Sequence, residues 1–176
     1  MTNSDPTTLN SQALFVTFRD VMARVGEFMF HWSLLEQGLT NSIQEMRESR
    51  GFAKEKVDGT LPKRLEIWNR LASDLPQHSG QQATAQKLMV QVLRLKKVRN
   101  LIVHGLCAGV SMGEEGEPYI CCAVGGFVEP TGATVNYTFN DLEHFAQGID
   151  ACRRGFKSLS NFNYFVDDPD TRIQKP

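Results

Sequence analysis

Hydrophobic residues recur every three or four positions from residue 11 to residue 47, a spacing that predicts one long amphipathic helix. The predicted buried stripe of this helix comprises Leu14, Phe18, Val21, Met22, Val25, Met29, Trp32, Leu35, Leu39, Ile43 and Met46. Residues 1–10 precede the stripe, are polar, and are expected to be disordered. The glycines and charged residues of 48–59 indicate that a loop follows the helix.

Two further helices are predicted before residue 106. The second starts at Thr60, a favourable N-cap residue, with Pro62 in its first turn. The third starts at Ser79, which forms an S-x-x-Q capping box with Gln82, and it ends at Gly105. Both helices have an apolar stripe, which comprises Leu65, Trp68 and Leu71 in the second and Ala85, Leu88, Met89, Val92, Leu95, Val98 and Ile102 in the third.

The pattern then changes from helical spacing to alternating, β-branched and aromatic residues. Three such segments, 107–112, 119–124 and 134–139, are separated by stretches that contain glycine and proline. This arrangement predicts a small antiparallel β-meander.

A fourth helix follows the meander, and Asn140 and Glu143 are expected to cap it. Its inward face comprises Leu142, Phe145, Ile149, Cys152, Phe156 and Leu159. We therefore predict a mainly α fold, a four-helix up-and-down bundle with the β-meander inserted between the third and fourth helices. It is expected to form a single domain over residues 11–165, followed by a polar tail over residues 166–176.

Charge is distributed unevenly along the 176 residues, although the net charge is only −1. Residues 47–104 contain 12 basic and 5 acidic residues, a net charge of +7, and the segments on either side of them are acidic. A phosphate-binding surface would have such a basic block, but helices with solvated lysine and arginine give the same count.

No segment suggests a membrane protein or a secreted one. The longest apolar run, Ile120–Val124, is much shorter than the roughly 20 residues that span a bilayer. The first residues lack the basic and apolar regions of a secretory signal. The four cysteines form no CxxC pair and are expected to be reduced and buried, so a cytoplasmic protein is predicted.

Two groups of polar residues interrupt the apolar stripes. Glu36 lies close to the buried seam of the first helix, where a carboxylate needs a partner unless it reaches solvent at the edge of the stripe. Arg99, Asn100 and His104 meet near the end of the third helix. A guanidinium group binds phosphate oxygens bidentately, and an imidazole transfers protons near neutral pH.

A purely structural role for these residues is the alternative. In that case Arg99 would pair with Glu36, and His104 would cap the last carbonyl groups of its helix. A zinc site formed by His104, Cys107 and one of the adjacent Cys121 and Cys122 is a weaker hypothesis, since the ligand spacing matches no familiar pattern. The sequence contains no P-loop, GxGxxG or HExxH motif, so neither a cofactor nor a metal ion is expected.

The segment from Arg99 to His104 resembles the R-x4-6-H motif of the HEPN superfamily (higher eukaryotes and prokaryotes nucleotide-binding domains). It has the form R-x4-H, with Asn100 directly after the arginine, and it closes the third of four predicted helices. The stretch Trp32–Glu36 in the first helix is also similar to that superfamily. The resemblance covers most of residues 11–160.

The resemblance implies a metal-independent endoribonuclease that acts as a homodimer, often in a toxin–antitoxin or defence system with an antitoxin protein as partner. His104 would then be the acid or base and Arg99 the phosphate clamp, supported by Asn100 and Glu36. Other members of the superfamily are non-catalytic modules that bind RNA, nucleotides or proteins, which is the alternative function.

Two further sequence features refine this expectation. Lys96 and Lys97 are the basic residues closest to the motif and are the predicted RNA-binding residues. Position 106 is leucine, whereas the branch partnered with minimal nucleotidyltransferases has a tyrosine two residues after the histidine. That particular partnership is therefore not expected.

Overall fold

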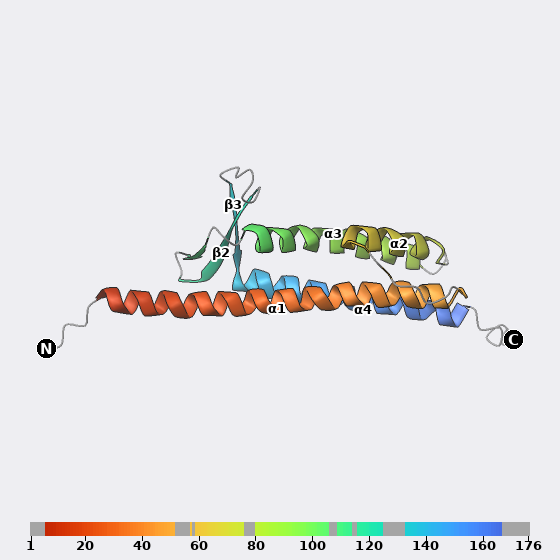
Figure 1. The fold of residues 1–176 in the computed structure, drawn as a ribbon, viewed down its shortest axis with the longest axis horizontal. Coiled ribbons are helices and arrows are strands. Elements are labelled where there is room, and N and C mark those ends of the chain that lie inside the picture. The colour runs from red at the N-terminus through yellow and green to blue at the C-terminus, as the bar shows by residue number, and fades with distance from the viewer. Residues whose placement is uncertain are drawn as a thin grey trace. The chain divides into compact units, whose positions relative to one another are not determined.

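A computed structural model describes residues 6–51, 57, 59–75, 80–105, 109–113, 116–124 and 133–166, with side chains described only between residues 18 and 160. This part of the chain is mainly helical, with four helices and a small sheet between the third and the fourth (Figure 1). The helices are α1 (Pro6–Glu48), α2 (Leu61–Ser73), α3 (Gln81–Gly105) and α4 (Phe139–Val166). The predicted fold class is confirmed.

The chain divides into two compact units, and the single domain over residues 11–165 stays a prediction. Unit 1 comprises residues 1–30 and 96–147, and unit 2 comprises residues 31–95 and 148–176. Helices α1, α3 and α4 each contribute residues to both units. The apolar period of a helix continues across such a boundary, so periodicity gives no sign of it.

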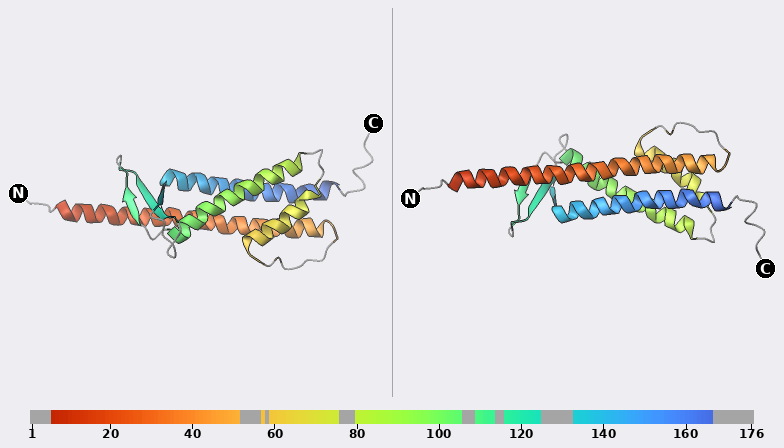
Figure 2. Two further views of the ribbon diagram at one scale, coloured as in Figure 1. Left: turned by 90° about the horizontal axis from the view of Figure 1, so that it is seen from above. Right: turned by 90° about the horizontal axis from the view of Figure 1, so that it is seen from below.

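Unit 2 is helical, and Trp68 of α2 joins three of its helices. The Trp68 ring is fully buried and contacts Phe156 of α4 edge-on, with ring centroids 4.9 Å apart. Its Nε1 donates a hydrogen bond of 2.9 Å to Ser42 Oγ of α1, which in turn donates to the carbonyl oxygen of Phe156. In both views of Figure 2, α2 lies beside the C-terminal part of α1.

The segments of α3 and α4 in unit 2 approach each other closely at small residues. A Cβ atom at Gly155 would lie 3.2 Å from the side chain of Leu88, and one at Gly148 would lie 3.7 Å from that of Leu95. The remaining core of unit 2 consists mainly of buried aliphatic side chains on all four helices, among them Leu35, Leu39, Ile43, Leu65, Val92 and Ile149.

Unit 1 contains the three-stranded antiparallel sheet, whose order is β1-β2-β3. The strands are β1 (Val110–Met112), β2 (Pro118–Ala123) and β3 (Thr134–Thr138), close to the predicted segments. The register places Val110 opposite Ile120, and Ile120 opposite Tyr137. Burial raises the pKa of Tyr137 above its ordinary value, and Cys122 and Asp141 add smaller contributions in the same direction.

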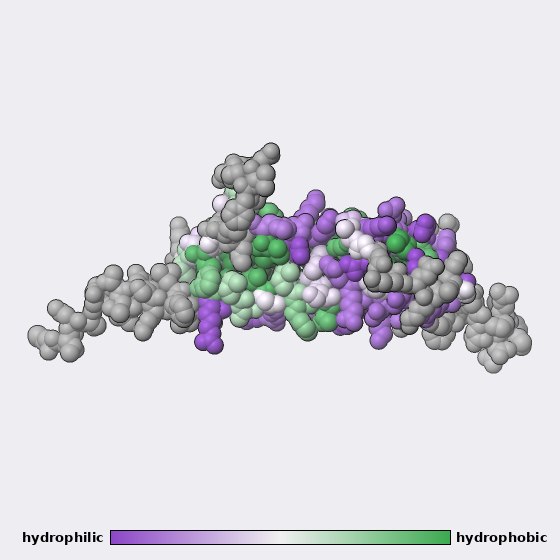
Figure 3. All heavy atoms as spheres, viewed as in Figure 1, coloured by the Kyte–Doolittle hydropathy of each residue, from purple (hydrophilic) through white to green (hydrophobic). Residues whose placement is uncertain are grey.

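Several predicted details of α1 differ in the structure. The helix begins at Pro6, five residues before the predicted start, so residues 6–10 are helical rather than disordered. Phe18 and Met22 belong to the predicted buried stripe but are 53% and 38% exposed. Hydrophobic residues gather over unit 1 on the face drawn in Figure 3.

The cap of α2 also differs from the prediction, and the capping box predicted for α3 involves a residue that is not described. Thr60 occupies the N-cap position of α2, but its side chain makes no capping hydrogen bond. Gln82 Nε2 donates to the carbonyl oxygens of Ser73 and Leu75, near the end of α2. Ser79, the other half of that box, lies outside the described residues.

Helix α4 starts with a capping box that the sequence analysis placed two residues too late. Thr138 Oγ1 accepts a hydrogen bond from the backbone N–H of Asp141, and the Asp141 carboxylate accepts one from the backbone N–H of Thr138. The predicted pair, Asn140 and Glu143, follows this box. Strand β3 ends at Thr138 and α4 begins at Phe139 with no loop between them, so the sequence pattern does not reveal where the helix starts. The predicted polar tail lies outside the described residues from 167 onward.

Candidate active site

Most of the predicted site residues lie in the last three turns of α3, within unit 1. Arg99 and Asn100 are half-buried, and Arg99 Nη1 donates a hydrogen bond of 3.2 Å to Asn100 Oδ1. His104 is exposed and lies one helical turn after Asn100. Because residues four apart share a helix face, the amide and the imidazole are on the same side of α3.

Arg99 pairs with no acidic group in the part of the chain that the structure describes. Among the residues that the structure describes, no carboxylate lies within ion-pair distance of its guanidinium group, and Asn100 is its hydrogen-bond partner. Its Nε is buried and has no hydrogen-bond partner in the same set. A half-buried cation in this state is suited to an anionic ligand, since a phosphate would supply the missing acceptors.

Lys96 and Lys97 extend the positive charge by one turn towards the start of α3. Lys96 is half-buried and Lys97 is exposed. Lys96, Asn100 and His104 succeed one another at intervals of four residues and therefore line one face. The face is basic at its start and has the imidazole at its end.

Gly105 sets the position of this helix end against the sheet. A Cβ atom there would lie 2.9 Å from the backbone oxygen of Ala123, 3.0 Å from its nitrogen and 3.1 Å from the Cβ of Cys122. Gly105 is absent from the residues with positive φ, so its role differs from that of a left-handed cap. The spacing predicted a helix cap at Gly105, but close packing on β2 is what requires glycine at this position.

Glu36 does not form the expected pair with Arg99. Its Oε2 lies 2.5 Å from Arg64 Nη2, and its Oε1 accepts a hydrogen bond of 2.7 Å from Trp32 Nε1. Arg64 Nη1 also donates to Thr40 Oγ1 at 3.0 Å. The structural alternative for Arg99 thus loses its proposed partner, and Glu36 is instead part of the packing of unit 2.

The described residues contain no group of three or more histidine, cysteine or acidic side chains arranged to hold a metal ion. Cys107, a ligand of the zinc hypothesis, lies outside these residues, as does Leu106. Cys121, Cys122 and Cys152 are free thiols. No helix in the described ranges has the length and apolar character required to cross a membrane.

Comparisons of this chain with protein-family models, curated proteins and solved structures return no match.

Sequence reasoning missed one polar feature, a pocket in unit 2 between α1 and α4. Its basic residues, Arg153, Arg154 and Lys157, come from a segment of the chain that is acidic overall. Regional charge counts conceal such a group. The sequence does contain one indication of this basic group: Arg153 and Lys157 are four residues apart, which places both on one helix face.

Proposed function

We propose that this chain is a metal-independent endoribonuclease of the HEPN type that acts as a homodimer in the cytoplasm. The observation that carries the proposal is the half-buried Arg99, which has no carboxylate partner among the described residues and lies on the same helix as the exposed His104. The resemblance of Arg99–His104 to the R-x4-H motif supports the same assignment. A role in a toxin–antitoxin or defence system, with an antitoxin protein as partner, belongs to the proposal through that resemblance.

RNA supplies its own nucleophile, the 2′-hydroxyl group next to the scissile phosphate. The 2′-oxygen attacks phosphorus as its proton passes to a base, and the bond from phosphorus to the 5′-oxygen breaks as that oxygen accepts a proton. The products are a 2′,3′-cyclic phosphate and a 5′-hydroxyl. His104 transfers one of these protons, a role worth on the order of 10²–10⁴-fold in rate.

Arg99 stabilises the negative charge that develops on the phosphorane oxygens. A donor held in place before the reaction acts most strongly on such charge. Asn100 orients the guanidinium group through their 3.2 Å hydrogen bond, and Lys96 and Lys97 hold the neighbouring phosphates of the RNA.

A second copy of the chain completes the proposed site. A single imidazole cannot accept the 2′-proton and donate to the leaving oxygen in one step, whereas two imidazoles related by a two-fold axis can divide these roles. Light scattering or sedimentation is expected to give a dimer at micromolar concentration. A monomer under these conditions would contradict the proposal.

The decisive experiment is cleavage of single-stranded RNA in excess EDTA. Wild-type protein is expected to cleave, and His104→Ala is expected to lose the activity while it keeps its helical circular dichroism spectrum. Arg99→Ala is expected to lose most of the activity, and Arg99→Lys is expected to restore little of it, because an ammonium group cannot replace the bidentate fork. RNA with 2′-methoxy groups should resist cleavage.

His144→Ala is the matched control, since His144 is another exposed histidine on a helix of unit 1 and lies outside the motif. It should cleave like the wild type. Equal residual cleavage by wild type and His104→Ala would identify a contaminating nuclease and leave a non-catalytic binding module as the function. RNA binding that persists in His104→Ala and weakens steeply with salt would then support such a module.

A further inference from the structure

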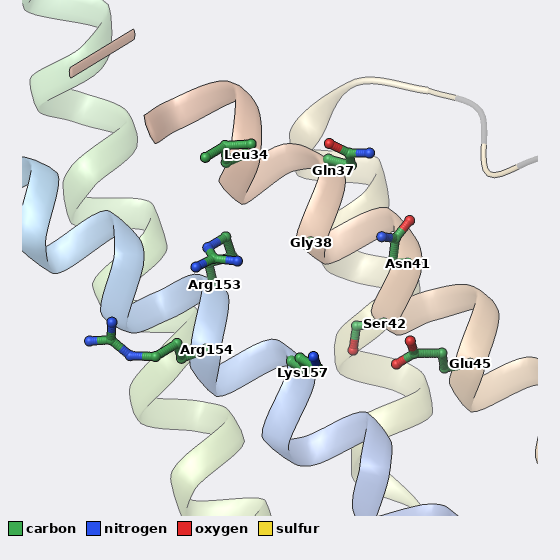
Figure 4. A pocket seen from close by; sticks show the side chains of 9 residues that line it. All are labelled: Leu34, Gln37, Gly38, Asn41, Ser42, Glu45, Arg153, Arg154 and Lys157. Carbon is green, nitrogen blue, oxygen red and sulfur yellow. The ribbon is translucent and has the colours of Figure 1, made fainter. Parts of the chain in front are cut away.

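A pocket of about 350 Å³ lies in unit 2, between the segments of α1 and α4 that this unit contains (Figure 4). It is lined by Leu34, Gln37, Gly38, Asn41, Ser42, Glu45, Arg153, Arg154 and Lys157. Among the described lining residues, Leu34 is the one with an aliphatic side chain, and the others are polar apart from Gly38. The volume is at the lower end of the range for small-molecule sites, which are roughly 300–1,000 Å³.

Two cationic groups of α4 remain available in this pocket. Arg153 donates from Nε and Nη2 to a single oxygen of Asp150, at 3.0 and 2.8 Å, so its Nη1 keeps both hydrogens unused within the described residues. In the same set, no carboxylate lies within ion-pair distance of Lys157 Nζ. The two residues are four apart and lie on one helix face, where a single phosphate group could contact both.

Arg154 is different from these two residues. Its Nη1 is hydrogen-bonded to the second oxygen of Asp150, and its side chain is 67% exposed. Figure 4 shows it pointing away from α1, whereas Lys157 lies on the side of α4 that faces Ser42 and Glu45. Arg154 lines the pocket and shares the Asp150 carboxylate with Arg153, so the matched control is Lys87 of α3, an exposed lysine of unit 2 that is not among the lining residues.

Gly38 has no side chain, and the Arg153 side chain occupies the space beside it. A Cβ atom at Gly38 would lie 3.0 Å from Arg153 Cγ, so the aliphatic part of the arginine side chain crosses α1 at this glycine. Glycine in a helix interior costs about 0.5–1 kcal/mol relative to alanine, and here it places the guanidinium group at the pocket.

The α1 side of the pocket supplies neutral and acidic hydrogen-bonding groups. Gln37 and Asn41 are exposed, and neither side chain has a hydrogen-bond partner among the described residues. The Glu45 carboxylate accepts a hydrogen bond from Ser160 Oγ and keeps further acceptor capacity. Amides with a carboxylate are the groups that recognise hydroxyls, and they lie opposite two cations suited to a phosphate.

We propose that this pocket binds a small phosphate monoester with a hydroxyl-bearing body, such as a sugar phosphate or a nucleoside monophosphate. Arg153 Nη1 and Lys157 Nζ hold the phosphate, and Asn41, Gln37 and Glu45 contact the hydroxyl groups. This site shares no residue with the Arg99–His104 motif, and its test does not depend on RNA cleavage.

Isothermal titration calorimetry of the full chain with ribose 5-phosphate tests the proposal, with ribose and inorganic phosphate as fragments. Ribose 5-phosphate is expected to bind on the order of tenfold more tightly than inorganic phosphate, and ribose should show no measurable binding at about 10 mM. Lys157→Gln and Arg153→Gln should each weaken binding by about tenfold, while Lys87→Gln should remain within about twofold of the wild type. Circular dichroism would verify that all three variants are folded.

The other outcomes overturn the proposal in distinct ways. An equal loss in Lys87→Gln would show unspecific attraction by the positive charge of unit 2. Inorganic phosphate that binds as tightly as ribose 5-phosphate would remove the hydroxyl-recognising half of the site. Binding of neither probe, nor of adenosine monophosphate, at about 10 mM would refute a phosphate monoester site altogether.

Discussion

Replacement of Gly105 by alanine should destabilise unit 1, although alanine is the better helix former. Two effects of opposite sign act at this position. Alanine stabilises a helix interior by about 1 kcal/mol relative to glycine. The new methyl group would, however, lie 2.9 and 3.0 Å from the backbone oxygen and nitrogen of Ala123, and a strand backbone cannot yield as the end of a flexible side chain can.

Overpacking of this kind costs typically about 1–3 kcal/mol, and the helical gain of at most about 1 kcal/mol offsets part of it, so we expect a net loss of up to about 2 kcal/mol for Gly105→Ala. Gly26→Ala is the matched control in the same unit. A Cβ atom at Gly26 meets nothing within 4 Å, and this variant should gain about 0.5–1 kcal/mol. The two glycine-to-alanine changes are therefore predicted to have opposite signs.

Urea denaturation followed by circular dichroism measures both changes. Hydrogen exchange resolved by mass spectrometry locates them, and protection should fall in residues 118–123 for Gly105→Ala alone. A Gly105→Ala variant that is as stable as Gly26→Ala would refute the close packing of α3 on β2. The same result would also argue against the idea that packing on β2 fixes the position of His104, the residue before Gly105.

Three further predictions concern stability. Glu36→Ala should lower the free energy of unfolding by about 2–3 kcal/mol in urea titrations, because it leaves the charge of Arg64 unpaired at a side chain that is only 14% exposed. Arg64→Met should cost less, because the Glu36 side chain that it leaves unpaired is 33% exposed and better solvated. Equal losses in the two variants would contradict this asymmetry. Thr138→Ala should cost about 1 kcal/mol through loss of the cap shared with Asp141, and a loss near zero would argue against that cap. Burial raises the pKa of Cys152 to about 11, so the folded state disfavours the thiolate, and stability should fall as pH rises from about 9 to about 11. Urea titrations at both ends of this range should show a smaller decline for Cys152→Ala, and an identical decline would refute the assignment.

Local sequence patterns were sufficient to locate the helices and strands. A helix repeats its apolar face every 3.6 residues and a strand every two, and both periods are visible without knowledge of any partner. The predicted segment 119–124 corresponds to β2, Pro118–Ala123, and the predicted third helix does end at Gly105. Boundaries were less certain, since Thr138 was assigned to a strand when its hydroxyl also caps the following helix.

Sequence spacing predicted which site residues lie close together on one helix, but not which residues of other helices they contact. Arg99, Asn100 and His104 are close in sequence, so helical geometry alone predicts that they lie near one another. The partner of Glu36 could not be obtained from the same reasoning. Spacing indicates which face of a helix a residue occupies, but the residue opposite that face belongs to a distant segment, and Arg64 rather than Arg99 fills the role.

The sequence by itself determined the mainly α character, the place of the small sheet between the third and fourth helices and the Arg99–His104 motif, because all three depend on residues that are neighbours along the chain. Only the tertiary structure decided that the chain forms two compact units, that Gly105 packs on Ala123, and that Arg153 crosses α1 at Gly38. The two glycine contacts join residues that are 18 or more positions apart along the chain. The free energy of such contacts comes from shape and charge complementarity, which periodicity does not encode.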